Sequence, residues 1–332
     1  MARPPEQPTP DVLRRAVDLL RQGGLVGLPT ETVYGLAADA ENELAVRRIF
    51  AVKGRPSTHP LIVHLGSAEA VPAWVNRLPA EAERLARAFW PGPLTLVLPR
   101  SARASDTVTG GQGTVAVRVP AHPVALAVLG AFGGGLAAPS ANRFGRVSPT
   151  QAAHVVEDLG DEVDLVLDGG RCSVGLESTI VDLSGPEPAV LRPGGVPLEA
   201  LESVLGRRPA LRAGGDVRAP GMLPSHYAPR AGLSLAPRSG AAELAARLVR
   251  EGRRVALCGP AAIALPPGVV HLTAPEEVPE LARALYELLR AVDAAGVDVA
   301  VVVVPEAEGL GLAVLDRLVR ASAPRAGAGS GL

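Results

Sequence analysis

The sequence predicts an α/β protein with a larger domain followed by a smaller one. Its 332 residues, of which 47% are hydrophobic, can fill two cores. Stretches with helical spacing of apolar residues alternate with short apolar runs that suit strands. This alternation lapses between residues 206 and 232 and then resumes. We therefore expect one α/β domain on each side of that stretch.

The larger domain is expected to hold a mixed sheet covered by helices. Thr9 and Pro10 are typical of a helix start, and Asn42 caps a second helix that ends near Gly54 and delivers Lys53 and Arg55 onto a loop. The expected helices are 9–22, 42–54, 67–75, 79–89, 123–132, 150–159 and 198–205. The expected strands are 25–28, 61–64, 94–98, 114–120, 136–138, 163–167, 178–183 and 189–192, of which the last two resemble a hairpin.

Residues 207–232 are expected to form a linker with a function of its own. A plain spacer needs only Gly, Ser or Pro, yet this segment holds Met222, His226 and Tyr227. Such side chains indicate a lid that folds over a site. A linker that merely docks on its own domain is the alternative.

The smaller domain, residues 233–322, is expected to be parallel α/β. Strands at 233–235, 255–258 and 299–304 alternate with helices at 241–250, 278–294 and 313–320. The unbroken valines at 301–304 are typical of a strand buried on both faces. Gly309-Leu310-Gly311 precedes the last helix, where a phosphate could bind, but a tight turn is favoured. The tail, 323–332, is expected to be disordered.

Composition narrows the classes of function. A formal net charge of −1 argues against electrostatic binding to nucleic acid over a large surface. Cys172 and Cys258 match no metal-ligand spacing and no disulfide framework, which favours a reducing compartment. No apolar run reaches membrane-spanning length, and the first ten residues lack a signal-peptide pattern. We therefore expect a cytoplasmic protein.

Four polar clusters lie at or beside ends of expected strands. They are Thr30, Glu31 and Thr32 with Tyr34; Lys53, Arg55 and His64; Thr114 with Arg118; and Ser140 with Asn142. Strand ends in an α/β sheet meet in a crevice, so these side chains are expected to share one site. Two cations, hydroxyls and an amide suit a polyphosphate.

Lysine usage strengthens this interpretation. Lys53 is the single lysine among 33 basic residues. A compact ammonium beside Arg55 meets phosphate differently from a guanidinium. A chance lysine at a helix C-terminus is an equal alternative on composition alone. The chain shows no Walker-type glycine loop and no signature of a Ser-His-Asp or Cys-His nucleophile.

The motifs carry a resemblance to a known family. PTETVYGLAADA, KGRPSTHPLIVH, TVAVRVP, PSANRFGRVSPT, GLESTIVDL with VLRPG, HYAP and the ending GLGLAVLDRLVRAS occur in this order. With them the chain resembles the two-domain threonylcarbamoyl-AMP synthases, the long form of the YrdC-like family. The resemblance implies a YrdC-like domain at 1–206, with a twisted mixed sheet around a basic cavity, and a smaller Rossmann-like domain.

The resemblance also implies an activity. The family reaction joins L-threonine, bicarbonate or CO2, and ATP to give L-threonylcarbamoyladenylate and pyrophosphate, with Mg2+ accompanying the ATP. Other proteins then transfer the threonylcarbamoyl group to tRNA. Positioning and charge stabilisation would supply most of the catalysis, which agrees with the missing nucleophile signature.

Site residues follow from the resemblance motif by motif. The implied catalytic residues, which handle phosphate, are Lys53, Arg55, Ser140 and Asn142. The remaining implied ATP contacts are His59, Thr114, Ser148, Arg192, His226 and Tyr227. The implied L-threonine contacts are Thr32, His64, Arg118, Ala138 and Ser178. The metal ligands are left unassigned. The chain departs from the family pattern at His59, where Asn is usual, and at Phe144, where Ser is common.

Three questions stay open at this point. Glu31 could help to place Mg2+ or could pair with an arginine. A double-stranded-RNA-binding protein is a rival interpretation, although balanced charge and few aromatic residues disfavour it. A carbamoyl-transfer domain that works on carbamoyl phosphate, without ATP, is a third.

Overall fold

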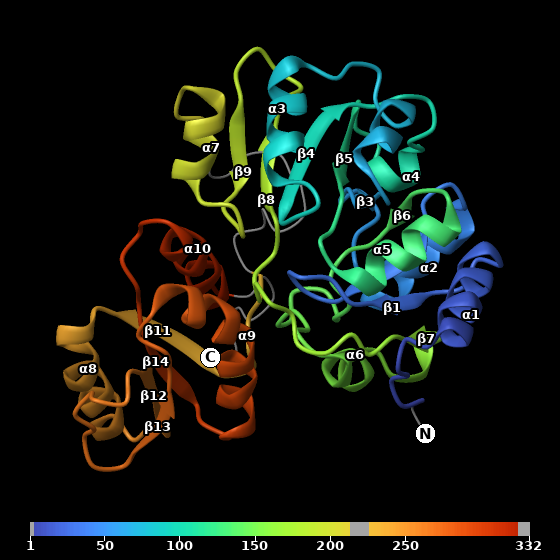
Figure 1. Cartoon of the computed structure of the whole chain (residues 1–332). Coiled ribbons are helices and arrows are strands. Elements are labelled where there is room, and N and C mark those ends of the chain that lie inside the picture. Colours follow the sequence, from blue (N-terminus) through green and yellow to red (C-terminus); the bar gives the residue numbers. More distant parts are fainter. Residues whose placement is uncertain (1–2, 213–225, 325–332) are drawn as a thin grey trace. The chain divides into compact units, whose positions relative to one another are not determined.

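The structure, a computed structural model, describes residues 3–212 and 226–324. The chain divides into two compact units (Figure 1). The first comprises Met1–Phe144 and Ser148–Met222, and the second comprises Gly145–Val147 and Leu223–Leu332. The second unit includes Gly145–Val147 because Ala228 N donates to Gly145 O (3.1 Å) and Arg290 Nη2 donates to Val147 O (3.1 Å). The domain boundaries drawn from the sequence stay predictions.

A mixed sheet forms the centre of the first unit, and this confirms the predicted α/β architecture. Within the described residues it has ten strands in the order β10-β9-β8-β4-β5-β3-β6-β2-β1-β7. Their bounds are β1 Val26–Leu28, β2 Gly35–Asp39, β3 Ile62–His64, β4 Leu94–Pro99, β5 Thr114–Arg118, β6 Leu136–Ala137, β7 Leu165–Val166, β8 Thr179–Asp182, β9 Ala189–Arg192 and β10 Ala210–Leu211. β3 and β5 run parallel, whereas their outer neighbours β6 and β4 run antiparallel to them.

Helices begin and end largely where the sequence indicates. The Thr9 side chain accepts a hydrogen bond from Val12 N, and the Asn42 side chain accepts from Leu44 N and Ala45 N. Gly54 ends α2 in the left-handed conformation, with φ 63°. The bounds are α1 Pro10–Arg21, α2 Glu43–Lys53, η1 Ala68–Ala73, α3 Ala80–Phe89, α4 Asp106–Thr109, α5 Pro123–Phe132, α6 Ala152–Leu159, η2 Gly160–Glu162 and α7 Leu198–Leu205.

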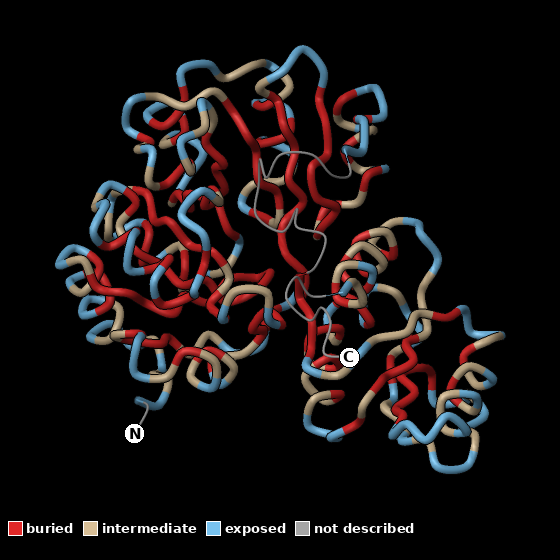
Figure 2. The backbone as a smooth tube through the Cα atoms, turned by 180° about the vertical axis from the view of Figure 1, so that it is seen from behind, coloured by how far each residue is buried: buried red, intermediate tan, exposed pale blue. Residues whose placement is uncertain are grey.

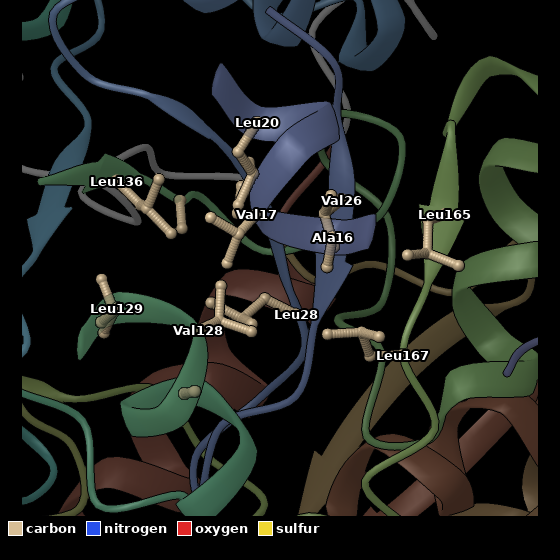
Figure 3. Packing of buried hydrophobic residues seen from close by; sticks show 13 residues of the cluster. Ala16, Val17, Leu20, Val26, Leu28, Val128, Leu129, Leu136, Leu165 and Leu167 are labelled. Atoms are coloured by element: carbon tan, nitrogen blue, oxygen red, sulfur yellow. The ribbon is translucent and has the colours of Figure 1, made fainter. Parts of the chain in front are cut away.

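The core of the first unit lies between two helices and one end of the sheet (Figure 3). Ala16, Val17 and Leu20 of α1 pack with Val128 and Leu129 of α5 and with buried residues of β1, β2, β6 and β7. All residues of β1 to β9 except Asp39, Pro99 and Thr114 are buried, and Figure 2 colours buried residues red. Burial of these apolar faces holds the sheet, and therefore the residues at its strand ends, in place.

Two segments refine the local expectations. β2 was not expected, because Gly, Ala and Asp have low β-propensity. It forms because β1 pairs with it on one side and β6 on the other. The helical segment expected at 67–75 is present as the 3₁₀ helix η1, which contains Pro72.

The second unit has a parallel sheet, as predicted, and in its described part this sheet has four strands, one more than expected. The strand order is β11-β14-β12-β13. The bounds are β11 Gly232–Ala236, α8 Arg238–Arg250, β12 Val255–Gly259, β13 Val269–Thr273, α9 Val278–Ala294, β14 Val299–Val303 and α10 Leu310–Ser322. β13 was not expected.

The ends of the second unit bear on two sequence predictions. Gly309 has φ 54° and precedes α10, as the favoured turn requires. Of the tail expected to be disordered, residues 325–332 lie outside the described residues, as does linker residue Met222. None of the helices in the ranges 3–212 and 226–324 is long and apolar enough to cross a bilayer.

Candidate active site

Lys53 is the centre of the first polar cluster. It is the last residue of α2, and its side chain is buried, at 3% exposed. Nζ donates to the backbone oxygens of Ser140 (2.5 Å) and Asn142 (2.6 Å), which joins three of the four implied catalytic residues. Burial lowers the pKa of Lys53 well below its usual value, and the neighbouring Arg55 adds to this. Lys53 was expected on the loop after the helix, and this was wrong, because Lys53 belongs to the last turn of α2.

Arg55 extends this cluster through the loop after α2. Its Nη2 donates to Pro60 O (3.0 Å), and its guanidinium lies 5.7 Å from the ring centre of Phe144. The His59 ring lies 5.6 Å from the same Phe144 ring. The two positions at which the chain departs from the family pattern are therefore neighbours, and both adjoin Arg55. Burial, and then the charge of Arg55, lowers the pKa of His59.

Arg118 is the centre of a second cluster, at the end of β5. Its Nη1 donates to Thr32 Oγ1 (2.9 Å), its Nε donates to Gly92 O (3.3 Å), and its Nη2 forms an ion pair with Glu31 Oε1 (2.7 Å). Arg118 and Glu31 are both buried. Of the two roles left open for Glu31, the structure shows the pairing with arginine.

His64 lies beside Arg118, because the parallel register of β3 and β5 pairs these two residues. Its Nδ1 lies 3.3 Å from Ile62 O. Burial, with the positive charge of Arg118 as the second cause, lowers the pKa of His64 to about 3. The imidazole is therefore neutral near pH 7, so it can accept or donate a hydrogen bond without adding a third charge.

Ser178 and Arg192 lie at the same end of the sheet as Arg118. Arg192 donates to Ser178 O through Nη2 (2.9 Å) and Nε (3.2 Å) and to Ser178 Oγ (3.1 Å), while Thr95 Oγ1 lies 2.7 Å from Ser178 Oγ. An implied ATP contact therefore touches an implied threonine contact. Ser148, another implied ATP contact, donates to Glu177 Oε1 (2.7 Å), and both are buried.

The strand register separates the two clusters along the sheet. Thr114 begins β5 and Arg118 ends it, so they are about 13 Å apart at the rise of an extended strand. Because β3 and β5 are parallel, Thr114 lies at the same end of the sheet as Pro60. The carbonyl oxygen of Pro60 accepts the hydrogen bond from Arg55. Thr114 and Arg118 therefore lie at opposite ends of β5, and the expectation that all four clusters share one site stays a prediction. The carboxyl-end rule applies to parallel sheets, and this sheet is mixed.

Residues 30–34 connect the two clusters. Thr32 bonds to Arg118 at one side, and at the other side Tyr34 O accepts from Ala141 N (2.8 Å), next to Ser140. Ser140 itself forms a bridge with Gly35. Ala138, an implied threonine contact, donates through its N to Ile62 O (3.1 Å).

His226 and Tyr227 lie in the second unit, and both are buried. Tyr227 has φ 62°, which is rare for a residue other than glycine. Its ring lies 4.2 Å from His226 and 5.7 Å from Tyr286, and the Arg317 guanidinium lies 5.1 Å from its centre. Their assignment as ATP contacts and as a lid stays a prediction.

The structure draws attention to two further residues beside the predicted site, Glu177 and Tyr34. Glu177 was not predicted as a site residue, although it directly precedes the predicted threonine contact Ser178 in the motif GLESTIVDL. Tyr34 was noted only as part of a cluster; its hydroxyl donates to Gly170 O (2.7 Å) and accepts from Gly169 N (3.1 Å). It therefore ties the connecting segment to the loop before β8.

Among the described residues, no group of three or more His, Cys, Asp or Glu side chains could hold a metal ion. Mg2+ usually binds one or two protein carboxylates and otherwise takes phosphate and water oxygens. The expectation that Mg2+ accompanies ATP stays a prediction.

Comparisons with known proteins identify the family of this chain. A family model for the Sua5, YciO and YrdC proteins, described as telomere recombination, matches residues 18–194, and a model described as the C-terminal domain of threonylcarbamoyl-AMP synthase matches 196–323. The chain is 44% identical to threonylcarbamoyl-AMP synthase of Pyrococcus abyssi over 94% of each chain. It is 38% identical to that of Bacillus subtilis, over 94% of this chain and 93% of the relative.

A solved structure extends the match to three dimensions. A crystal structure of P. abyssi Sua5 complexed with L-threonine has a TM-score of 0.88 and 44% identity, and the match covers 93% of this chain and 94% of that one. Order of motifs, fold and full-length similarity therefore agree, and the chain belongs to the two-domain threonylcarbamoyl-AMP synthase family.

Proposed function

We propose that the chain is a nucleotidyltransferase that makes L-threonylcarbamoyladenylate and pyrophosphate from L-threonine, bicarbonate or CO2, and ATP. The observation that carries this is the pair of clusters on one sheet. One cluster holds Lys53 against Ser140 and Asn142, and the other holds Arg118 against Thr32 and beside His64. Family membership supports the same reaction.

The Lys53 cluster suits the triphosphate. A phosphate beside Nζ would favour the charged form of Lys53 and so would offset the lowering of its pKa by burial. Arg55 would offer a planar fork to the same phosphates. Mg2+ bound with ATP would neutralise charge on the departing pyrophosphate.

The Arg118 cluster suits the amino acid. Guanidinium groups bind carboxylates in a planar geometry, and the Thr32 hydroxyl already fixes the orientation of Arg118. The threonine nitrogen takes up bicarbonate carbon to form a carbamate, and a carbamate oxygen attacks the α-phosphate in line. The protein contributes orientation and charge stabilisation in this scheme. The product is the substrate for proteins that transfer the threonylcarbamoyl group to tRNA.

The test is pyrophosphate release from ATP with each substrate omitted in turn. Release should require L-threonine and bicarbonate together, and mass spectrometry should detect the mixed anhydride. Release that ignores threonine would defeat the proposal. Turnover of carbamoyl phosphate without ATP, or RNA binding that falls steeply with salt and shows no ATP turnover, would favour the rival interpretations instead.

A further inference from the structure

Glu31 is a buried carboxylate with few partners. It is 5% exposed, and it faces the buried Arg118 in an ion pair of 2.7 Å. Neither of its carboxylate oxygens accepts a hydrogen bond from the described residues, and Nη2 of Arg118 likewise donates none to them. Buried polar atoms in proteins are rarely left in this state, and those that are call for an explanation.

Stability does not explain this pair. Burying two charges costs several kcal/mol per ion on the order-of-magnitude scale, and the attraction offsets it only when further hydrogen bonds complete both partners. Arg118 has such bonds to Thr32 and Gly92, but Glu31 has none among the described residues. Both oxygens of this carboxylate can therefore accept a hydrogen bond from a further donor.

Three charged or titratable groups lie near this carboxylate. Arg118 faces it from β5, His122 from the start of α5, and Cys172 from the segment before β8. Burial lowers the pKa of His122, and burial raises the pKa of the Cys172 thiol to about 12, with Glu31 as the second cause. Both are therefore neutral between pH 7 and 10. Glu177, another buried carboxylate, is already occupied by the Ser148 hydroxyl.

The proposed substrate brings the missing donor. L-Threonine carries a carboxylate, which suits Arg118, and an ammonium, which suits a buried carboxylate at hydrogen-bond distance. The ammonium has no lone pair, so it must lose a proton before nitrogen can attack carbon. General bases act through this kind of contact.

We propose that Glu31 is a catalytic residue that receives the α-ammonium group of L-threonine and removes its proton for carbamate formation. This inference rests on the proposed function and assigns a role within its amino-acid site. Ammonium and carboxylate become amine and carboxylic acid. The amine nitrogen then forms the N–C bond to bicarbonate, a C–O bond breaks, and water leaves. Threonine ammonium plus bicarbonate thus gives carbamate, water and one proton, and Glu31 carries that proton.

The experiment compares wild type with Glu31→Gln and Glu31→Asp, by threonine-dependent pyrophosphate release from pH 6 to 10. At pH 7 the Gln variant should turn over about 10²–10⁴-fold more slowly, the usual range for loss of a general base. Its rate relative to wild type should rise about tenfold per pH unit as free threonine loses its own ammonium proton. Dividing the rate of the variant by that of wild type removes the effect of Lys53 titration, because both proteins contain Lys53.

Two comparisons separate a base from a structural group. Glu31→Asp keeps a carboxylate, so it should be slower than wild type but with a ratio that does not change with pH. Glu41→Gln breaks an exposed ion pair with Arg103 of the same 2.7 Å length and should behave as wild type. Thermal unfolding should show that all three variants are folded at the assay temperature.

Each failure has a distinct meaning. A Gln variant with wild-type rates, or one slower by the same factor at every pH, would overturn the inference, because Glu31 would then at most hold Arg118. If the Gln variant does not fold, an Asp variant whose ratio rises with pH would overturn it equally. A wild-type enzyme that releases no pyrophosphate in response to threonine would instead refute the proposed function.

Discussion

Replacing Lys53 by methionine tests the phosphate cluster most directly. Methionine keeps an unbranched chain of similar length but removes the ammonium group. The two carbonyl oxygens that Nζ contacts, at 2.5 and 2.6 Å, would lose their charged donor. Because these belong to Ser140 and Asn142, the change also loosens the segment that carries the other implied catalytic side chains.

The structure predicts a modest loss of stability and a large loss of turnover. Two hydrogen bonds from a charged donor stabilise the fold by roughly 1.5–3 kcal/mol each. Burial of the ammonium costs several kcal/mol on the same order-of-magnitude scale, as the lowered pKa of Lys53 indicates, and methionine removes that cost. The net change should stay within about 2 kcal/mol. Loss of a charge aimed at the transition state has no such offset and should cost about 10²–10³-fold in turnover.

As pH rises, the stability of the wild-type protein should increase while its turnover decreases. The folded-state pKa of Lys53 lies below its unfolded value, so between the two values the unfolded chain binds more protons. The stability of the wild type therefore rises with pH in this window, which ends near the usual lysine pKa of 10.5, and the methionine variant lacks that gain. Turnover of the enzyme, which needs the charged form, should fall as pH rises through the folded pKa at low ATP.

Urea unfolding and threonine-dependent pyrophosphate release measure the two effects in parallel. Arg87→Met, which removes an exposed cation from α3, is the matched control and should change neither. Turnover at wild-type level in Lys53→Met would refute the reasoning. So would an activity loss that merely follows the fraction of unfolded protein, because Lys53 would then be a structural residue.

Three further predictions concern other parts of the first unit. The pKa of His64 is about 3 in the folded protein and 6.5 in the unfolded chain, so the protein should become less stable as pH falls between these values. The loss should be about 2 kcal/mol from pH 7 to 5. Urea unfolding of wild type and His64→Asn checks this, and equal dependence of their stability on pH would contradict it. Cys172, whose thiol has a pKa of about 12, should react with a thiol reagent at pH 8 only after unfolding; rapid labelling of native protein would contradict its burial. Gly194→Ala places a Cβ 2.4 Å from backbone atoms of Glu177, Ser178 and Thr179, so it should lower the free energy of unfolding by about 1–3 kcal/mol. Calorimetry should also show weaker binding of threonine. The control Gly185→Ala places a Cβ with nothing within 4 Å and should change neither stability nor binding.

Local sequence patterns predicted the elements that local chemistry can specify. Thr9 and Asn42 were predicted as helix caps because their side chains bond to amides within the next three residues. The helix at 198–205 and the strand at 189–192 have the predicted bounds. The ordered motifs predicted the family, and with it the reaction and the candidate residues.

Tertiary structure decided what depends on residues distant in sequence. β2 exists because two strands pair with it, and the sequence of β2 alone does not favour a strand. Lys53 is buried because the segment at 140–142 covers it, and burial, not sequence, lowers its pKa. The ion pair joins Glu31, which follows β1, to Arg118, the last residue of β5. Sequence by itself thus determined which side chains are available for the chemistry, whereas long-range packing determined their charge, orientation and partners, because electrostatic energies depend on distance and desolvation.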